Sequence, residues 1–117
     1  MISETILDFG DPLVSELESD MPLEVIRSVF EMVITVWNAH VTAMPRWGKP
    51  QFLADLEQRL GDPQLPPDAV EALHALSMRR RLPRFASDDR AVGEWSLVAG
   101  AEGWRLRCDA RAPSATG

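Results

Sequence analysis

The sequence predicts an α+β fold: a mainly helical bundle of about five helices followed by a C-terminal antiparallel β-hairpin. As far as residue 81, apolar side chains recur every three or four positions, as they do on amphipathic helices. From about residue 92, apolar and polar residues largely alternate, which is typical of strands. With 117 residues, 45% of them hydrophobic, the chain suits one compact domain over residues 1–111, and residues 112–117 are predicted to be a flexible tail.

Prolines, glycines and short polar residues set the limits of the predicted helices. These helices cover residues 3–8, 11–18, 22–44, 52–60 and 67–81. The long helix of about 22–44 has an apolar arc wide enough to be touched on more than one side; it includes Val25 and Trp37, and Pro45 ends the helix. We therefore expect it to be central. In the fourth helix, Phe52, Leu53, Leu56 and Leu60 form one tight apolar stripe.

The hairpin is predicted from its two alternating strands, about 92–99 and 104–111, joined by a turn with a glycine at each end. Pairing Ala99 with Trp104 sets Leu97 against Leu106 and Trp95 against Cys108, which puts every apolar partner on one face. A slip of one residue would set Trp95 against an arginine, so the pattern fixes the register. Since an isolated hairpin is marginal in water, its apolar face must cover the helices or another chain.

Charge is distributed unevenly. Residues 1–26 hold seven acidic residues and no lysine or arginine, whereas residues 79–117 hold eight arginines and five acidic residues, within a net charge of −6. The candidate binding residues are Arg79, Arg80, Arg81, Arg84, Arg105, Arg107 and Arg111. They could contact nucleic-acid phosphates, or the acidic N-terminal segment of the same chain or of a twofold mate. The acidic balance and the inward tryptophans weigh against nucleic acid.

Two further side chains are candidates for chemistry. His40 lies in the middle of the apolar arc with no Asp, Glu or Cys one turn away, so we expect a neutral buried histidine bonded to a backbone carbonyl rather than a catalytic one. Cys108 alternates with apolar residues and is expected to be an inert core thiol. No metal-ligand spacing, phosphate loop or nucleophile motif is present, so no metal or cofactor is predicted.

These observations favour a small non-catalytic binding or regulatory subunit that acts through the hairpin edge and the charged ends. The expected partner is another protein or a second copy of the chain. A nucleic-acid-associated accessory protein is the alternative, an enzyme centred on His40 comes third, and no small-molecule ligand is indicated. Charged residues such as Arg27 and Glu31 interrupt the longest apolar stretch, and the N-terminus lacks a signal-peptide pattern, so we expect a cytoplasmic protein with no membrane span.

Overall fold

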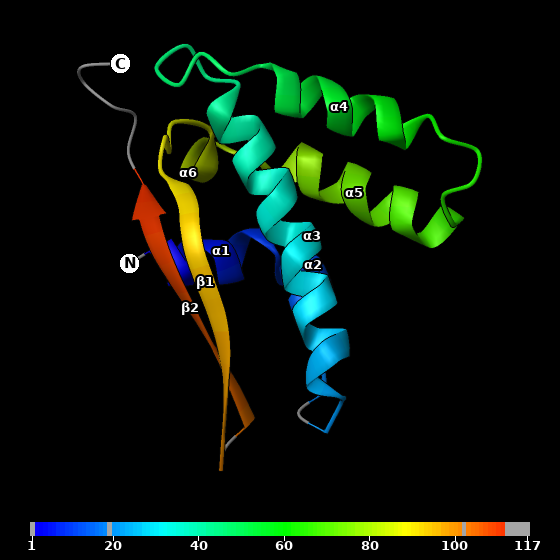
Figure 1. The fold of residues 1–117 in the computed structure, drawn as a ribbon, viewed down its shortest axis with the longest axis vertical. Coiled ribbons are helices and arrows are strands. Elements are labelled where there is room, and N and C mark those ends of the chain that lie inside the picture. The colour runs from blue at the N-terminus through cyan, green and yellow to red at the C-terminus, as the bar shows by residue number, and fades with distance from the viewer. Residues whose placement is uncertain (1, 19, 102, 112–117) are drawn as a thin grey trace.

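The computed structural model describes residues 2–18, 20–101 and 103–111, and these form six helices and one two-stranded antiparallel sheet (Figure 1). The helices are α1 (Ile2–Phe9), α2 (Asp11–Val14), α3 (Leu23–Thr42), α4 (Gln51–Leu60), α5 (Pro67–Arg79) and α6 (Pro83–Ala86). The strands are β1 (Ala91–Gly100) and β2 (Gly103–Arg111). The predicted α+β class is confirmed, whereas the predicted flexible tail, residues 112–117, lies outside the described residues.

Helix α3 is the centre of the fold, as its wide apolar arc predicts. It contacts α1, α4, α5 and β1, and it completely buries Phe30, Val33 and Trp37. Val25 is an exception: it was expected in the buried arc but is 46% exposed. The reason is visible in Figure 1, where the first turns of α3 extend beyond α1, α2 and α5. None of the helices in the described ranges is long and apolar enough to cross a membrane.

Three aromatic rings from distant parts of the chain meet against α3. Phe9 of α1 packs edge-on against Trp37, with ring centroids 5.1 Å apart, and against Phe85 of α6 at 5.6 Å. Trp37 and Phe85 complete the triangle at 6.1 Å. Edge-to-face pairs of this kind add to the free energy gained from burial alone. Helix α6, which holds Phe85, was not predicted, because four residues are too few to show a helical period.

The predicted hairpin register is confirmed: Ala99 pairs with Trp104, Leu97 with Leu106 and Trp95 with Cys108. The sequence did not reveal a β-bulge near the base of β1. There, Val92 pairs with Ala110, and Gly93 and Glu94 together oppose the single residue Asp109. The extra residue shifts the alternation of faces between the two sides of the bulge. Ala91 and Val92, which precede it, are both buried.

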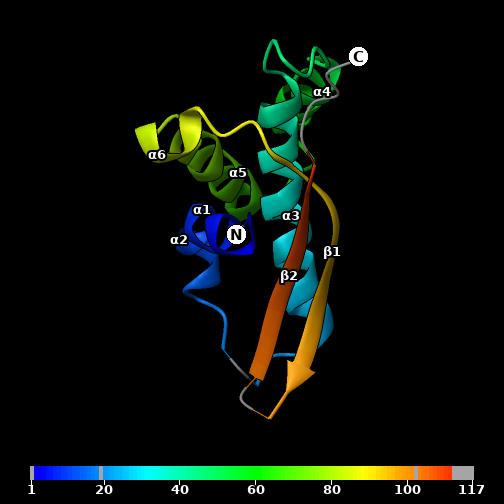
Figure 2. The same cartoon turned by 90° about the vertical axis from the view of Figure 1, so that its left-hand side faces the viewer.

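The apolar face of the hairpin covers the helices of its own chain. Leu97, Leu106 and Cys108 are buried in the same core as α1 and α3, and Trp104 packs edge-on against Phe30 with ring centroids 5.1 Å apart. Figure 2 shows α3 behind the hairpin, with β1 and β2 forming the outer layer of the molecule. The opposite side of the hairpin, called the outer face below, bears Ser96, Val98, Arg105 and Arg107 and faces away from the helices.

Candidate functional site

Two of the predicted binding arginines hold the C-terminal end of α1. The Nε of Arg79 donates a hydrogen bond of 2.8 Å to the carbonyl oxygen of Phe9, and its Nη2 donates one of 2.6 Å to that of Asp8. The Asp8 carboxylate accepts an ion pair of 3.2 Å from Arg84. These two arginines therefore bind the protein's own acidic N-terminal segment, which is the intrachain alternative raised by the charge distribution.

Arg80 is part of the interior. Its side chain is only 5% exposed, and it donates hydrogen bonds to the carbonyl oxygens of Phe85 and Asp88. The guanidinium carbon lies 4.6 Å from the ring centroid of Trp37, a cation–π contact. Burial lowers the pKa of Arg80, and Asp88 partly offsets this. A guanidinium group held in this way supports the fold and offers no surface to a phosphate.

The expected arginine patch is thus divided between two regions. Arg79, Arg80 and Arg84 are used internally, and Arg81 is exposed beside them on the helical side of the molecule. Arg105 and Arg107 are exposed on the outer face of the hairpin, and neither forms an ion pair or hydrogen bond with any residue in the described ranges. Of the predicted surface, the hairpin part is the part that remains open.

His40 is shielded as expected, but its expected hydrogen bond is absent. Its Nε2 atom is buried and has no hydrogen-bond partner among residues 2–18, 20–101 and 103–111. The guanidinium groups of the neighbours Arg80 and Arg81 can only donate, so they offer no acceptor to a protonated ring nitrogen. Burial, and then these two arginines, lower the pKa of His40 against a weaker opposing effect of Glu57. The ring is therefore held neutral.

Cys108 is an inert thiol by position. It is 8% exposed, and burial raises the pKa of the thiol to about 11, so the reactive thiolate is scarce at neutral pH. Its backbone N–H donates a hydrogen bond of 2.9 Å to the Oγ of Ser3, which lies along the edge of β2 that does not pair with β1. No group of three or more His, Cys, Asp or Glu side chains placed to hold a metal ion occurs in the part of the chain that the structure describes.

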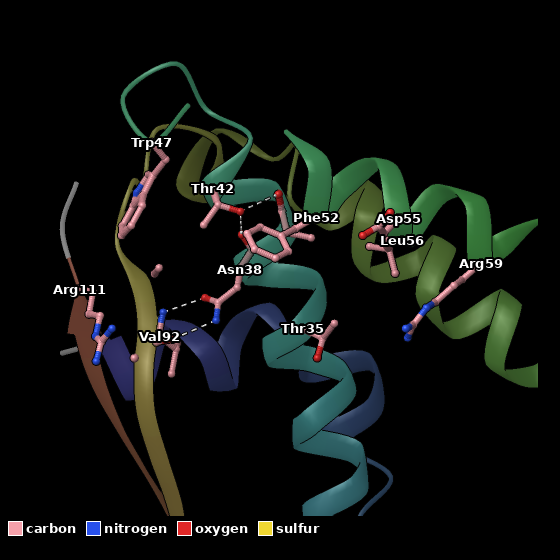
Figure 3. A pocket seen from close by; sticks show the side chains of 13 residues that line it. Thr35, Asn38, Thr42, Trp47, Phe52, Asp55, Leu56, Arg59, Val92 and Arg111 are labelled. Atoms are coloured by element: carbon pink, nitrogen blue, oxygen red, sulfur yellow. Dashed lines mark hydrogen bonds between the residues drawn. The ribbon is translucent and has the colours of Figure 1, made fainter. Parts of the chain in front are cut away.

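The sequence did not reveal a groove of about 480 Å³ between α3, α4 and the base of β1 (Figure 3). Its walls are mainly apolar and aromatic; they include Ala39, Trp47, Phe52, Leu56 and Val92. Thr35, Asn38, Thr42, Asp55, Arg59 and Arg111 supply its polar atoms. In Figure 3, Arg59 and Arg111 lie on opposite sides of the groove, and Phe52 and Asn38 lie between them.

Hydrogen bonds from α3 and the following loop fix the wall of this groove. Asn38 bridges both backbone polar groups of Val92: its Oδ1 accepts the N–H at 2.8 Å, and its Nδ2 donates to the carbonyl oxygen at 2.9 Å. The indole N–H of Trp47 donates a hydrogen bond of 2.7 Å to the backbone carbonyl oxygen of Asp89. The indole N–H of Trp37 donates one of 2.8 Å to the backbone carbonyl oxygen of Arg90. The base of β1 is therefore held rigidly against α3.

Two residues of the groove depart from the sequence expectation. Phe52 belongs to the predicted apolar stripe of α4, yet it is 51% exposed, because the stripe is only partly covered. Arg111 was expected on the outward side of the hairpin, but its side chain passes over Gly93 into the groove lining: a Cβ atom at Gly93 would lie 2.4 Å from Arg111 Nε. A glycine inside a strand was the one available signal of this close approach.

Comparisons with models of protein families, with curated proteins and with solved structures find no match to this chain. The arguments about function therefore rest on the two sites described above, the outer face of the hairpin and the groove.

Proposed function

We propose that this protein is a small non-catalytic binding subunit that contacts another protein through the outer face of its β-hairpin. The observation that carries the proposal is the pair of exposed arginines, Arg105 and Arg107, which no described residue neutralises. Beside them, Val98 leaves 47% of its surface exposed and pairs across the strands with Arg105. An apolar side chain bordered by free guanidinium groups suits a partner with carboxylates around an apolar contact.

A second copy of the chain offers such a surface. Asp11, Glu16, Glu18, Asp20 and Glu24 are all exposed, and none of them forms an ion pair with a described residue. This acidic segment, residues 11–24, lies on the helical side of the molecule, whereas the outer face of the hairpin points away from the helices (Figure 2). Among the described residues, no ion pair joins the two surfaces within one chain. A twofold dimer would let each hairpin face the acidic segment of its mate.

The positions of His40 and Cys108 support the non-catalytic part of the proposal. His40 is held neutral with its Nε2 shielded, and Cys108 is buried with a raised pKa. In the part of the chain that the structure describes, no hydrogen bond to an acidic or basic side chain orients either group, as catalysis would require. The lone cysteine, which excludes an internal disulfide, fits the reducing cytoplasm as the place of action.

Light scattering on the purified full chain tests the proposal. At low salt we expect the mass of a dimer for the wild type and that of a monomer for the double variant Arg105→Glu, Arg107→Glu. Added salt should shift the wild type toward monomer, because ion pairs at a surface are screened. Arg81→Glu is the matched control, since it reverses an exposed arginine on the helical side. A wild type that stays monomeric at every salt concentration contradicts the dimer.

The exposed Arg105 and Arg107 also favour a second candidate, binding to nucleic-acid phosphates. A fluorescent single-stranded oligonucleotide titrated with the protein distinguishes the two. Tight binding that falls steeply with salt, and that the double variant abolishes, would favour nucleic acid over a protein partner.

A further inference from the structure

We propose that the groove between α3, α4 and the base of β1 binds a small organic anion with an aromatic or branched apolar body, and that Arg111 pairs with its carboxylate. The volume of about 480 Å³ lies within the range of sites for small molecules. It is large enough for a compound of one or two rings. The argument rests on the walls of the groove, on its uncommitted polar groups, and on the way in which Arg111 is placed.

The walls fit a flat apolar body. Phe52 is a large apolar side chain of the groove, and it remains 51% exposed, whereas Leu56, one turn later on α4, is buried. Trp47 lies on another wall, with its indole N–H already bonded to Asp89, so it presents ring surface to the groove. When an apolar ligand covers exposed aromatic surface in a concave site, that surface is removed from water, which favours binding.

The free polar groups of the groove favour an anion. The Asn38 amide is held by Val92 through one N–H and its oxygen, and the hydroxyl of Thr42 donates a hydrogen bond of 2.7 Å to the carbonyl oxygen of Asn38. Among the described residues, Arg59 and Arg111 have no ion-pair partner. Two arginines and the single carboxylate of Asp55 leave the lining with a formal charge of +1.

Asp55 and Arg59 are four residues apart on α4, so they share one face of that helix and offset each other's charge. The excess positive charge is therefore at Arg111. A planar guanidinium group binds a carboxylate through two parallel hydrogen bonds, which is the pairing that we assign to this residue.

The backbone places Arg111 for this role. The β-bulge at Gly93 and Glu94 and the absent side chain of Gly93 leave the space in which the Arg111 side chain lies over β1. A Cβ atom at Gly93 would lie 2.4 Å from Nε and 2.9 Å from Cδ of Arg111, so a side chain there would displace the arginine. The φ angle of Gly93 is not positive, which means that alanine fits its backbone conformation.

The test uses two ligands of the same shape, 1-naphthoate and the neutral 1-naphthamide, titrated into the full-length protein. Binding is followed by NMR at the Val92 amide and the Trp47 indole N–H, both of which every variant keeps. We expect the wild type to bind naphthoate roughly tenfold more tightly than naphthamide, the ratio that one charge-assisted pair can supply. Both Arg111→Ala and Gly93→Ala should reduce this ratio to about one, and Gly93→Ala does so without changing the net charge.

Arg107→Ala is the matched control, because it removes an arginine from the same strand but on the outer face; it should keep the preference for naphthoate. Phe52→Ala should weaken the binding of both ligands to the same extent, because it removes an apolar side chain from the groove and changes no charge. The proposal fails if neither compound shifts the two reporter signals at millimolar concentration, or if wild type binds both equally. It also fails if Arg107→Ala loses the preference as Arg111→Ala does. Since these signals report on the groove alone, they are independent of whether the hairpin mediates a dimer.

Discussion

The molecule has two regions that bury their apolar residues to very different extents. In the first, called the core region here and made of α1, α3, α6 and the hairpin, whole apolar faces are enclosed, with Phe9, Phe30 and Trp37 fully buried. In the second, the arm formed by α4 and α5, each helix has a single buried residue, Leu56 or Leu76. Both arm helices contact α3, and in Figure 1 both run away from the hairpin. The core region holds the fold together, whereas the arm leaves apolar surface available for binding.

The largest predicted effect is at the centre of the core region. Trp37→Ala removes a fully buried side chain, two ring contacts and the hydrogen bond to Arg90, so we expect it to lower the free energy of unfolding by about 3–5 kcal/mol. Urea denaturation followed by circular dichroism measures this. Trp37→Phe should recover part of the loss, since it restores a ring. A loss under about 1 kcal/mol for Trp37→Ala would mean that the core region is not the dominant source of stability.

Asn38 lies where the core region borders the groove: it belongs to α3, lines the groove and bonds to β1. Asn38→Ala leaves the N–H and carbonyl oxygen of Val92 without partners, and we expect a loss of about 1–3 kcal/mol in the free energy of unfolding. Hydrogen exchange should show faster exchange of the Val92 amide than in the wild type. Thr35→Ala, on the same side of α3, is the control and should leave this amide unchanged.

The neutral His40 makes stability depend on pH at the junction of α3 with the arm. Its pKa in the folded protein lies below its ordinary value of 6.5, so the unfolded chain takes up a proton first as the pH falls. This contribution to stability is complete above pH 6.5 and is lost as the pH falls from there through the lowered pKa. Denaturation midpoints between neutral pH and about pH 5 should fall less in His40→Gln than in the wild type. His74→Gln, which changes an exposed histidine of α5, is the matched control. Identical slopes in the wild type and His40→Gln would contradict the lowered pKa.

The smallest effect is expected in the arm. Phe52→Ser replaces a half-exposed ring, so stability should change by no more than about 0.5 kcal/mol, even though the residue type suggests a core position. Thermal denaturation measures this, with Leu56→Ser as a buried neighbour that should be clearly destabilising. A large loss of stability in Phe52→Ser would mean that the Phe52 ring is part of the core. The ring would then not be available to contact a ligand.

The hairpin was predictable in detail, because a slip of one residue from the observed register would have placed Trp95 against an arginine. The positions of the arginines were not predictable. A run of three at the end of α5 suggests one exposed patch, yet Arg80 lies inside while Arg81 stays outside. Which of them turns inward depends on carbonyl groups, those of Phe85 and Asp88, that the chain brings back only after α6. The local spacing of apolar residues does not show that the chain brings these carbonyl groups back to Arg80.

The groove was hidden for the same reason. Its lining comes from α3, α4, the loop at Trp47 and both strands, and the residues in it have ordinary types for a helix face or a strand end. Helical spacing correctly put Phe52 on the apolar stripe of α4, but spacing does not tell how far a neighbouring element extends to cover that stripe. The bulge at Gly93 and Glu94 depends on the pairing with β2, which no single strand reveals.

The aromatic triangle of Phe9, Trp37 and Phe85 has a consequence for how the protein is made. During synthesis the N-terminal part of the chain leaves the ribosome first. One side of the apolar surface of α1 and α3 therefore stays uncovered until α6 has emerged. The strands that cover the other side of α3 emerge later still. Folding that depends on contacts between residues so far apart in the chain is slow. Hydrophobic surface stays exposed to solvent until those contacts form. The apolar surface of α1 and α3 is therefore enclosed only after α6 and the two strands have been synthesised.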